Sequence, residues 1–230
     1  MAGAIDPSSV DFCVINSCPQ PPTWCGEIIP DGLCDHINVI MDRDYAFEFV
    51  VLKEISDLDL KVDSSRGIGI GGKKVADSSV TIKSLKGDEH KAVVATYTKK
   101  FNANNIIFKG SGDGIVDVIT GRFNNNSITF KKKSADLVMF NDDAIINTST
   151  INAGGGTDTI TFMENSVIRG INEITLGPGK DVLELPANKR GKGKIIVTVW
   201  LATTPSESAI NPSVAGTSSK EKLIYLNMSS

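Results

Sequence analysis

The sequence predicts an all-β protein built as a short parallel β-solenoid of about 22 to 23 residues per coil. Three observations predict this fold: aspartates recur at a nearly constant interval, apolar residues recur at fixed positions between them, and Gly, Asn or Ser separates the short apolar segments. We expect cysteines and cap strands in residues 1–76, the coils in residues 77–200, and a linker with an extended arm in residues 201–230.

The repeat is anchored on aspartates separated by 25, 23, 22 and 23 residues, namely Asp88, Asp113, Asp136, Asp158 and Asp181. Two residues after the last four of them come Ile115, Val138, Ile160 and Leu183, and four residues after them come Asp117, Phe140, Phe162 and Leu185. Three short alternating segments cannot bury a face alone, but they bury one if each repeat is a coil stacked on the previous coil. Equivalent side chains would then form ladders at a spacing of about 4.8 Å. An antiparallel sandwich is the alternative, and the agreement of the apolar columns favours the solenoid.

Asparagines gather where the coils are expected to bend, at Asn104, Asn105, Asn124, Asn125, Asn126 and Asn147. Asparagine tolerates the left-handed backbone region, which favours tight bends at these positions. The segment GIGIGGKK (67–74) has the glycine and lysine spacing of a phosphate-binding loop, but Lys74 stands where a magnesium-binding Ser or Thr is needed. A β-branched segment rather than a helix follows it. We therefore expect a flexible hinge that enters the solenoid.

Two glycine-rich stretches, GGGTDTIT (154–161) and GPGKDVLE (177–184), resemble the nonapeptide of the repeats-in-toxin family. The resemblance covers under a tenth of the chain and implies calcium held by Asp158 and Asp181. The tandem repeats of that family place two turns on each coil, whereas the longer period here leaves one column of turns. Nearby lysines also disfavour a divalent cation. We therefore interpret the turns as scaffold corners and keep Asp158 and Asp181 as the calcium candidates.

All four cysteines lie near the N-terminus, at Cys13, Cys18, Cys25 and Cys34, and His36 follows them. Their spacing is unlike the paired Cys-x-x-Cys of zinc knuckles. Four thiolates could hold one zinc ion, with His36 as a substitute for one of them, and two disulfides are another reading. We favour free or disulfide-linked thiols over a metal site.

Composition narrows the classes of function. The net charge of -3 implies neither nucleic acid nor an anionic membrane as a partner. No run approaches 18 apolar residues and the start of the chain lacks the features of a secretory signal, so we expect no membrane insertion and a chain assembled in a cytoplasm. With two histidines and no nucleophile elbow, we expect no enzyme. A carbohydrate-cleaving β-helix enzyme using Asp113, Asp136 or Asp158 is the weakest alternative.

The C-terminal region combines a linker with a strand. Residues 202–222 are rich in Ser, Thr, Pro and Ala, which is typical of a linker. The apolar run LIYLNM (223–228) follows. It either folds back on its own domain or adds to a sheet edge of a neighbouring subunit. In the second case Leu223, Ile224, Tyr225 and Leu226 bind the partner.

A rigid repeat body with terminal arms suits a component of a larger assembly. In this respect the chain resembles the parallel β-solenoid architecture of phage-type virion structural proteins. The resemblance implies a non-enzymatic role in capsid decoration, a tail or a fibre, a homo-oligomer, and a location in the virion after assembly in the host cytoplasm. The alternative is an exported, calcium-binding adhesin or surface-layer protein of the repeats-in-toxin type, located outside the cell or on its surface. Calcium is the one cofactor that we consider.

Overall fold

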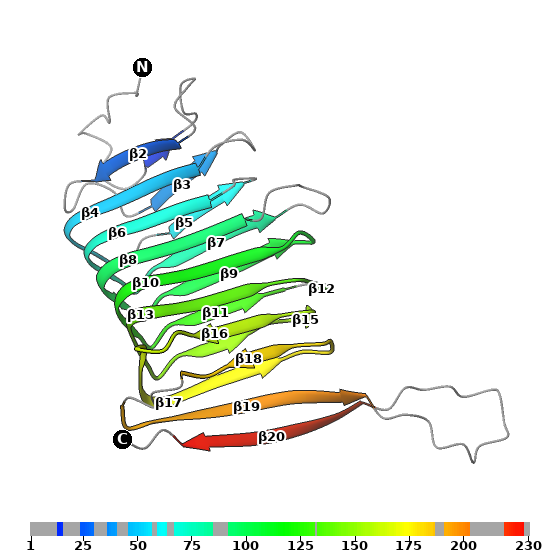
Figure 1. The fold of residues 1–230 in the computed structure, drawn as a ribbon. Helices are drawn as coiled ribbons and strands as arrows, with labels where there is room; N and C mark the ends of the chain where they lie inside the picture. The colour runs from blue at the N-terminus through cyan, green and yellow to red at the C-terminus, as the bar shows by residue number, and fades with distance from the viewer. Residues whose placement is uncertain are drawn as a thin grey trace, which may run out of the picture.

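The structure is a computed structural model that describes residues 13–15, 24–29, 36–40, 46–56, 59–63, 67–84, 92–131, 133–186, 191–202 and 219–227. These residues form a parallel β-solenoid, which confirms the predicted fold class (Figure 1). The described part of the chain contains strands and no helix, so no helix in it could cross a membrane.

Two stacks of strands make the long walls of the solenoid, and each coil adds one strand to each stack (Figure 1). The first wall consists of β2 (Trp24–Ile29), β4 (Ala46–Ser56), β6 (Gly67–Ala76), β8 (Ala92–Asn102), β10 (Gly114–Asn124), β13 (Leu137–Asn147), β16 (Thr159–Phe162) and β18 (Val182–Glu184). The second consists of β1 (Cys13–Ile15), β3 (His36–Ile40), β5 (Asp59–Asp63), β7 (Ser79–Ser84), β9 (Asn105–Gly110), β11 (Ser127–Phe130), β14 (Thr150–Asn152), β17 (Val167–Leu176) and β19 (Gly193–Ala202). A small third pair joins β12 (Lys133–Ser134) to β15 (Gly155–Gly156).

Neighbouring strands within each wall are parallel, which contradicts the antiparallel sandwich considered from the sequence. The repeat length is also confirmed. Asp136 and Asp158 lie on neighbouring coils 22 residues apart, and Asp158 and Asp181 are 23 residues apart. Parallel pairing is present on the N-terminal side of residue 77 as well, because β4 pairs with β6 and β3 pairs with β5.

Columns of apolar side chains fill the space between the walls, as the alternating pattern predicts. Val138 and Ile160 are in register on one wall, and both are buried. Aromatic rings stack from coil to coil, with centroid distances of 4.7 Å for Phe108 and Phe130 and 4.9 Å for Phe140 and Phe162. Burial of such columns is the main stabilising contribution that a repeat fold obtains from neighbouring coils.

The predicted inner column is wrong at one coil. Val116, not Ile115, is in register with Val138 and is buried, while Ile115 is in register with Leu137 on the outer face. A shift of one residue moves every side chain of a strand to the other face. Asp117 therefore also points outward, where its Oδ1 accepts a hydrogen bond of 2.6 Å from Asn141.

One corner of the coils is held by a ladder of buried polar side chains. Backbone N–H groups of one coil donate to side-chain oxygens of the next, from Ser78 to Asn104 at 2.9 Å and from Asn104 to Asn126 at 2.8 Å. The residues just before this ladder have left-handed backbones, with φ between 51° and 53° at Asp77, Ala103, Asn125 and Thr148. Of the asparagines expected to be left-handed, Asn125 is confirmed, whereas Asn104 and Asn126 act through their side chains.

The expected hinge at residues 67–74 is wrong, because these residues belong to β6. This strand is in parallel register with β4 on one side and β8 on the other. Its glycines alternate with Ile68 and Ile70, whose side chains are buried in the core. The glycine-rich segment thus supplies the same inward apolar face as the other coils, and this face stabilises it as a strand.

Candidate functional site

The recurring aspartates form a hydrogen-bonded ladder at the corner that leads into the first wall. Asp136 Oδ1 accepts from the backbone N–H of Gly114 at 2.7 Å, and Asp158 Oδ1 accepts from the N–H of Asp136 at 3.0 Å. Asp181 Oδ1 continues the series by accepting from the N–H of Asp158 at 3.0 Å. Each carboxylate thus satisfies an amide that the bend of the neighbouring coil leaves without a strand partner.

Asp113 does not occupy this column, although the sequence repeat places it there. Gly114 stands at the equivalent position, and a Cβ atom on it would lie 2.6 Å from the Phe108 ring and 2.8 Å from the Phe130 ring. Asp113 instead accepts a hydrogen bond of 2.9 Å from the N–H of Ala135. The ladder therefore starts one coil later than the sequence repeat indicates.

The two predicted calcium candidates, Asp158 and Asp181, lie on neighbouring coils in this ladder. One oxygen of each is taken by a backbone N–H group. Calcium requires six to eight oxygen ligands, and no group of three or more metal-ligating side chains is present among the residues that the structure describes. These hydrogen bonds are those of a scaffold corner, and calcium binding by Asp158 and Asp181 stays a prediction.

Asp158 and Asp136 are both buried, but the second oxygen of Asp136 accepts a hydrogen bond from the Ser134 hydroxyl. Asp158, which is 1% exposed, has no such partner. Its Oδ2 is buried and has no hydrogen-bond partner. Burial, together with the charges of Asp136, Asp181 and Asp113, raises the pKa of Asp158 to about 6, against the hydrogen bond from Asp136, which lowers it. The folded protein consequently binds this proton more tightly than the unfolded chain does.

We expect the stability of the protein to fall as the pH rises through about 6, because the raised pKa of Asp158 stabilises the fold only while its carboxyl group is protonated. The contribution is complete below the ordinary value of 3.8 and is lost above about 6. Asp158→Asn should remove this decline and, at neutral pH, raise the free energy of unfolding by roughly 2 kcal/mol relative to the parent. Urea unfolding from pH 4 to pH 8 measures it. The control Asp142→Asn, which removes an exposed carboxylate elsewhere, should still lose stability as the pH rises. The same loss of stability in Asp158→Asn would show that Asp158 is not its cause.

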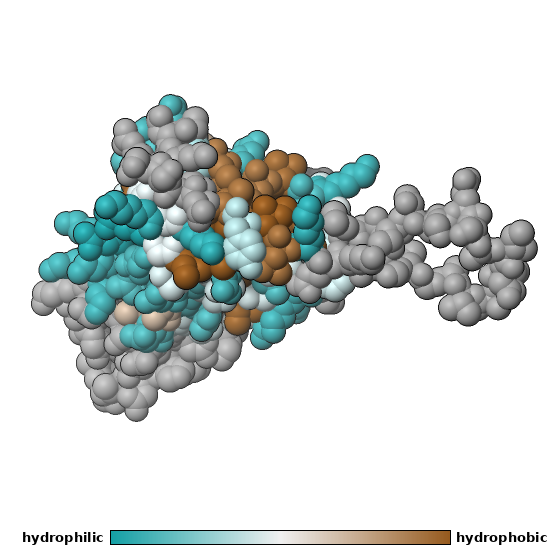
Figure 2. Space-filling model, turned by 90° about the horizontal axis from the view of Figure 1, so that it is seen from below, coloured by the Kyte–Doolittle hydropathy of each residue, from teal (hydrophilic) through white to brown (hydrophobic). Residues whose placement is uncertain are grey.

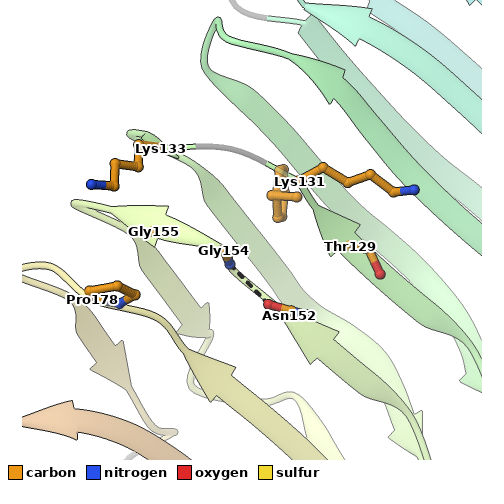
Figure 3. A pocket seen from close by; sticks show the side chains of 8 residues that line it. Thr129, Lys131, Lys133, Asn152, Gly154, Gly155 and Pro178 are labelled. Atoms are coloured by element: carbon orange, nitrogen blue, oxygen red, sulfur yellow. Dashed lines mark hydrogen bonds between the residues drawn. The ribbon is translucent and has the colours of Figure 1, made fainter. Parts of the chain in front are cut away.

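A shallow pocket of about 460 Å³ lies beside the same turns (Figure 3). It is lined by Lys131 and Lys133 of one coil, by Asn152, Gly154 and Gly155 of the next coil, and by Pro178. Its floor is the backbone at Gly154, whose N–H donates to Asn152 Oδ1 at 3.0 Å. Figure 3 shows that the two lysine side chains point away from each other. The residues lining the pocket include no carboxylate, histidine or cysteine. It therefore provides neither an acid and base pair nor a convergent anion site.

The cysteine cluster lies outside the described side chains. Cys13 and Cys25 belong to β1 and β2, whereas Cys18 and Cys34 are outside the described residues. The choice between zinc, disulfides and free thiols stays a prediction.

The C-terminal strand β20 (Ser219–Asn227) pairs antiparallel with β19 of its own chain. The run predicted to bind a partner thus folds back on its own domain, which is the first of the two alternatives for it. Leu223 is nevertheless 48% exposed and Tyr225 is 57% exposed, and Ile224 is exposed as well, whereas Leu226 packs against the core. The end view shows apolar side chains gathered on this end of the molecule (Figure 2). Sequence reasoning missed Trp200 on β19, which is also exposed.

Comparison with known proteins gives no family for this chain. No family model, curated protein or solved structure matches it. Function therefore has to be inferred from the geometry of the corners and of the C-terminal end.

Proposed function

We propose that this protein is a non-enzymatic structural subunit of a larger assembly, and that its C-terminal end attaches it to a neighbouring subunit. The observation that carries this proposal is the exposed apolar surface of β20. Exposed apolar side chains of this size, gathered on one end of a soluble body, are typical of an interaction surface. We call this surface the C-terminal end patch, and it consists of Trp200, Leu223 and Tyr225, which share the outer face of the β19–β20 pair. Ile224 lies on the opposite face, in register with the buried Val197.

The backbone of β20 supports the same proposal. Within the described residues β20 pairs with β19 alone, so its other edge presents N–H and C=O groups to a further strand. In sequence, the first half of β20 carries the charged residues Lys220, Glu221 and Lys222, while the second half is apolar. Strand addition to such an edge combines backbone hydrogen bonds with side-chain pockets.

The finer form of the proposal is a virion component, such as a capsid decoration, a tail or a fibre, in which other copies of the chain are the neighbours. Its support is the analogy of a rigid solenoid body with an attachment end. A solenoid is rigid along its axis because each coil is hydrogen-bonded to the next over its whole length. Attachment at one end would leave the walls available to other contacts.

Light scattering tests the proposal on the full chain. We expect the parent protein to be an oligomer whose molar mass does not change with millimolar calcium. The double variant Leu223→Asp, Tyr225→Asp should raise the dissociation constant of the oligomer at least tenfold, because it places charges in the apolar contact. Ile119→Asp is the matched control, since Ile119 is 41% exposed on β10, away from the patch, and should leave the mass unchanged.

Circular dichroism on the same samples confirms that each variant is folded. A monomeric parent, or an oligomer that the double variant does not weaken, would overturn the proposal. A monomer that gains β structure only with calcium would instead favour the adhesin of the repeats-in-toxin type.

A further inference from the structure

A stack of positive charges runs along the outside of three consecutive coils. Lys74 on β6 is in register with Lys100 on β8, and Lys100 is in register with Arg122 on β10. Lys73 and Lys99 precede the first two in the sequence and are exposed, as are Lys100 and Arg122. We call these five residues the basic ladder.

The repeated positive charges at Lys100 and Arg122 are unfavourable for the scaffold itself, whereas Lys74 also lies in register with Glu54 of β4. Neighbouring strands are about 4.8 Å apart, so the backbone positions that carry these charges repeat at that spacing. Like charges directly opposite each other on adjacent strands destabilise a sheet. The chain as a whole has a net charge of -3, so this concentration of positive charge is local. A stack of this kind suits a ligand that carries regularly repeated negative charges.

An aromatic ring lies beside the ladder. Tyr97 of β8 is in register with Gly71 of β6, and a Cβ atom at Gly71 would collide with the Tyr97 ring. The ring thus lies over Gly71, and the Tyr97 side chain stays partly exposed. Lys99 follows two residues later in the same strand. The glycine-rich sequence of β6, which suggested a phosphate loop or a hinge, makes room for this ring.

We propose that the basic ladder and Tyr97 form a binding surface for a linear acidic polysaccharide. The lysines and Arg122 would pair with carboxylate or sulfate groups, and the Tyr97 ring would contact the apolar face of a sugar ring. A polymer with one acidic group per sugar offers charges at regular intervals along one line, as the ladder does. The ladder lies on β6, β8 and β10, away from the C-terminal end patch, so attachment through β20 leaves it accessible (Figure 1).

Nucleic acid is a poorer match to these features. Proteins that bind single strands stack successive bases on several aromatic side chains, and the ladder has one ring beside it. The exposed large aromatic residues among the described side chains, Trp200 and Tyr225, lie on β19 and β20. Recognition of a duplex by base edges requires an element that enters a groove, and the ladder lies along the corner of a continuous wall.

Binding of a fluorescent polygalacturonate oligosaccharide to the full chain tests the proposal, with neutral dextran and a DNA duplex of matched charge as comparison probes. The triple variant Lys99→Gln, Lys100→Gln, Arg122→Gln should weaken polygalacturonate binding at least tenfold. The magnitude of the slope of the log association constant against log salt concentration should decrease by about 2 to 3, because fewer counterions are released on binding. The matched control is Lys109→Gln, Lys131→Gln, Lys133→Gln, which removes equal charge from another, exposed corner and should change affinity less than twofold.

Two further variants test the aromatic ring at constant charge. Gly71→Ala should displace Tyr97, and Tyr97→Leu removes the ring directly. Each should weaken binding several-fold without changing the salt slope, and thermal melting checks that each variant is folded. All ladder and ring variants should keep the molar mass of the parent, which separates this test from that of the C-terminal end patch. The proposal is overturned by equal losses in the two triple variants, by DNA binding as tight as that of polygalacturonate, or by no binding to polygalacturonate.

Discussion

Ile160→Asp is expected to lower the free energy of unfolding by about 4 kcal/mol or more, enough to leave much of the protein unfolded. Ile160 is fully buried in the inner column between Val138 and Leu183, which are its partners on the neighbouring coils. A carboxylate at this position would have no water and no positively charged partner. Urea unfolding followed by circular dichroism measures the loss.

The control for this change is the preceding residue. Thr159 is in register with Leu137 and Val182 on the outer face, and it is partly exposed. Thr159→Asp should cost about 1 kcal/mol or less, because the new charge reaches water and the main loss is strand propensity. Similar losses at the two positions would show that the inner and outer faces of β16 are assigned wrongly.

Gly156→Ala is expected to lower the free energy of unfolding by about 3 kcal/mol or more. Gly156 has a φ of 137°, a conformation that side chains with a Cβ atom rarely adopt. The added Cβ would also collide with the carbonyl oxygen of Ser134 on the neighbouring coil. Relief of that contact would require the two coils to separate at the corner that carries the aspartate ladder.

Gly155→Ala provides the comparison at the adjacent glycine. A Cβ atom there would lie 3.3 Å from the carbonyl oxygen of Pro178, which a small local shift can accommodate. We expect a loss of about 1 kcal/mol at most. Thermal or urea unfolding of the two variants side by side measures the difference. Equal stability of Gly156→Ala and Gly155→Ala would contradict the close approach of the coils.

Much of the architecture could be predicted from local patterns. Alternation of apolar residues predicted that Val138, Ile160, Phe140 and Phe162 point inward, and the repeat length predicted that they stack. The prediction was wrong where one coil departs from the average. At Asp113 the turn shifts by one residue, because the rings of Phe108 and Phe130 fill the inner space at Gly114. The segment GSGDGI (110–115) already places Asp113 one residue early against the glycine pattern of the later turns. The cause of the shift is not visible there, since the rings belong to other strands.

The sequence by itself determined the all-β class, the length of the coil and the recurrence of the aspartates, because alternation and repeat length are properties of the chain read locally. The tertiary structure decided which groups meet. It brings Lys74, Lys100 and Arg122 into one stack, buries Asp158 but leaves Tyr225 exposed, and pairs β20 with β19. The physical reason is that these neighbours depend on the register between coils. That register is set by packing of the inner side chains and by the hydrogen bonds at the corners, which join residues more than twenty positions apart.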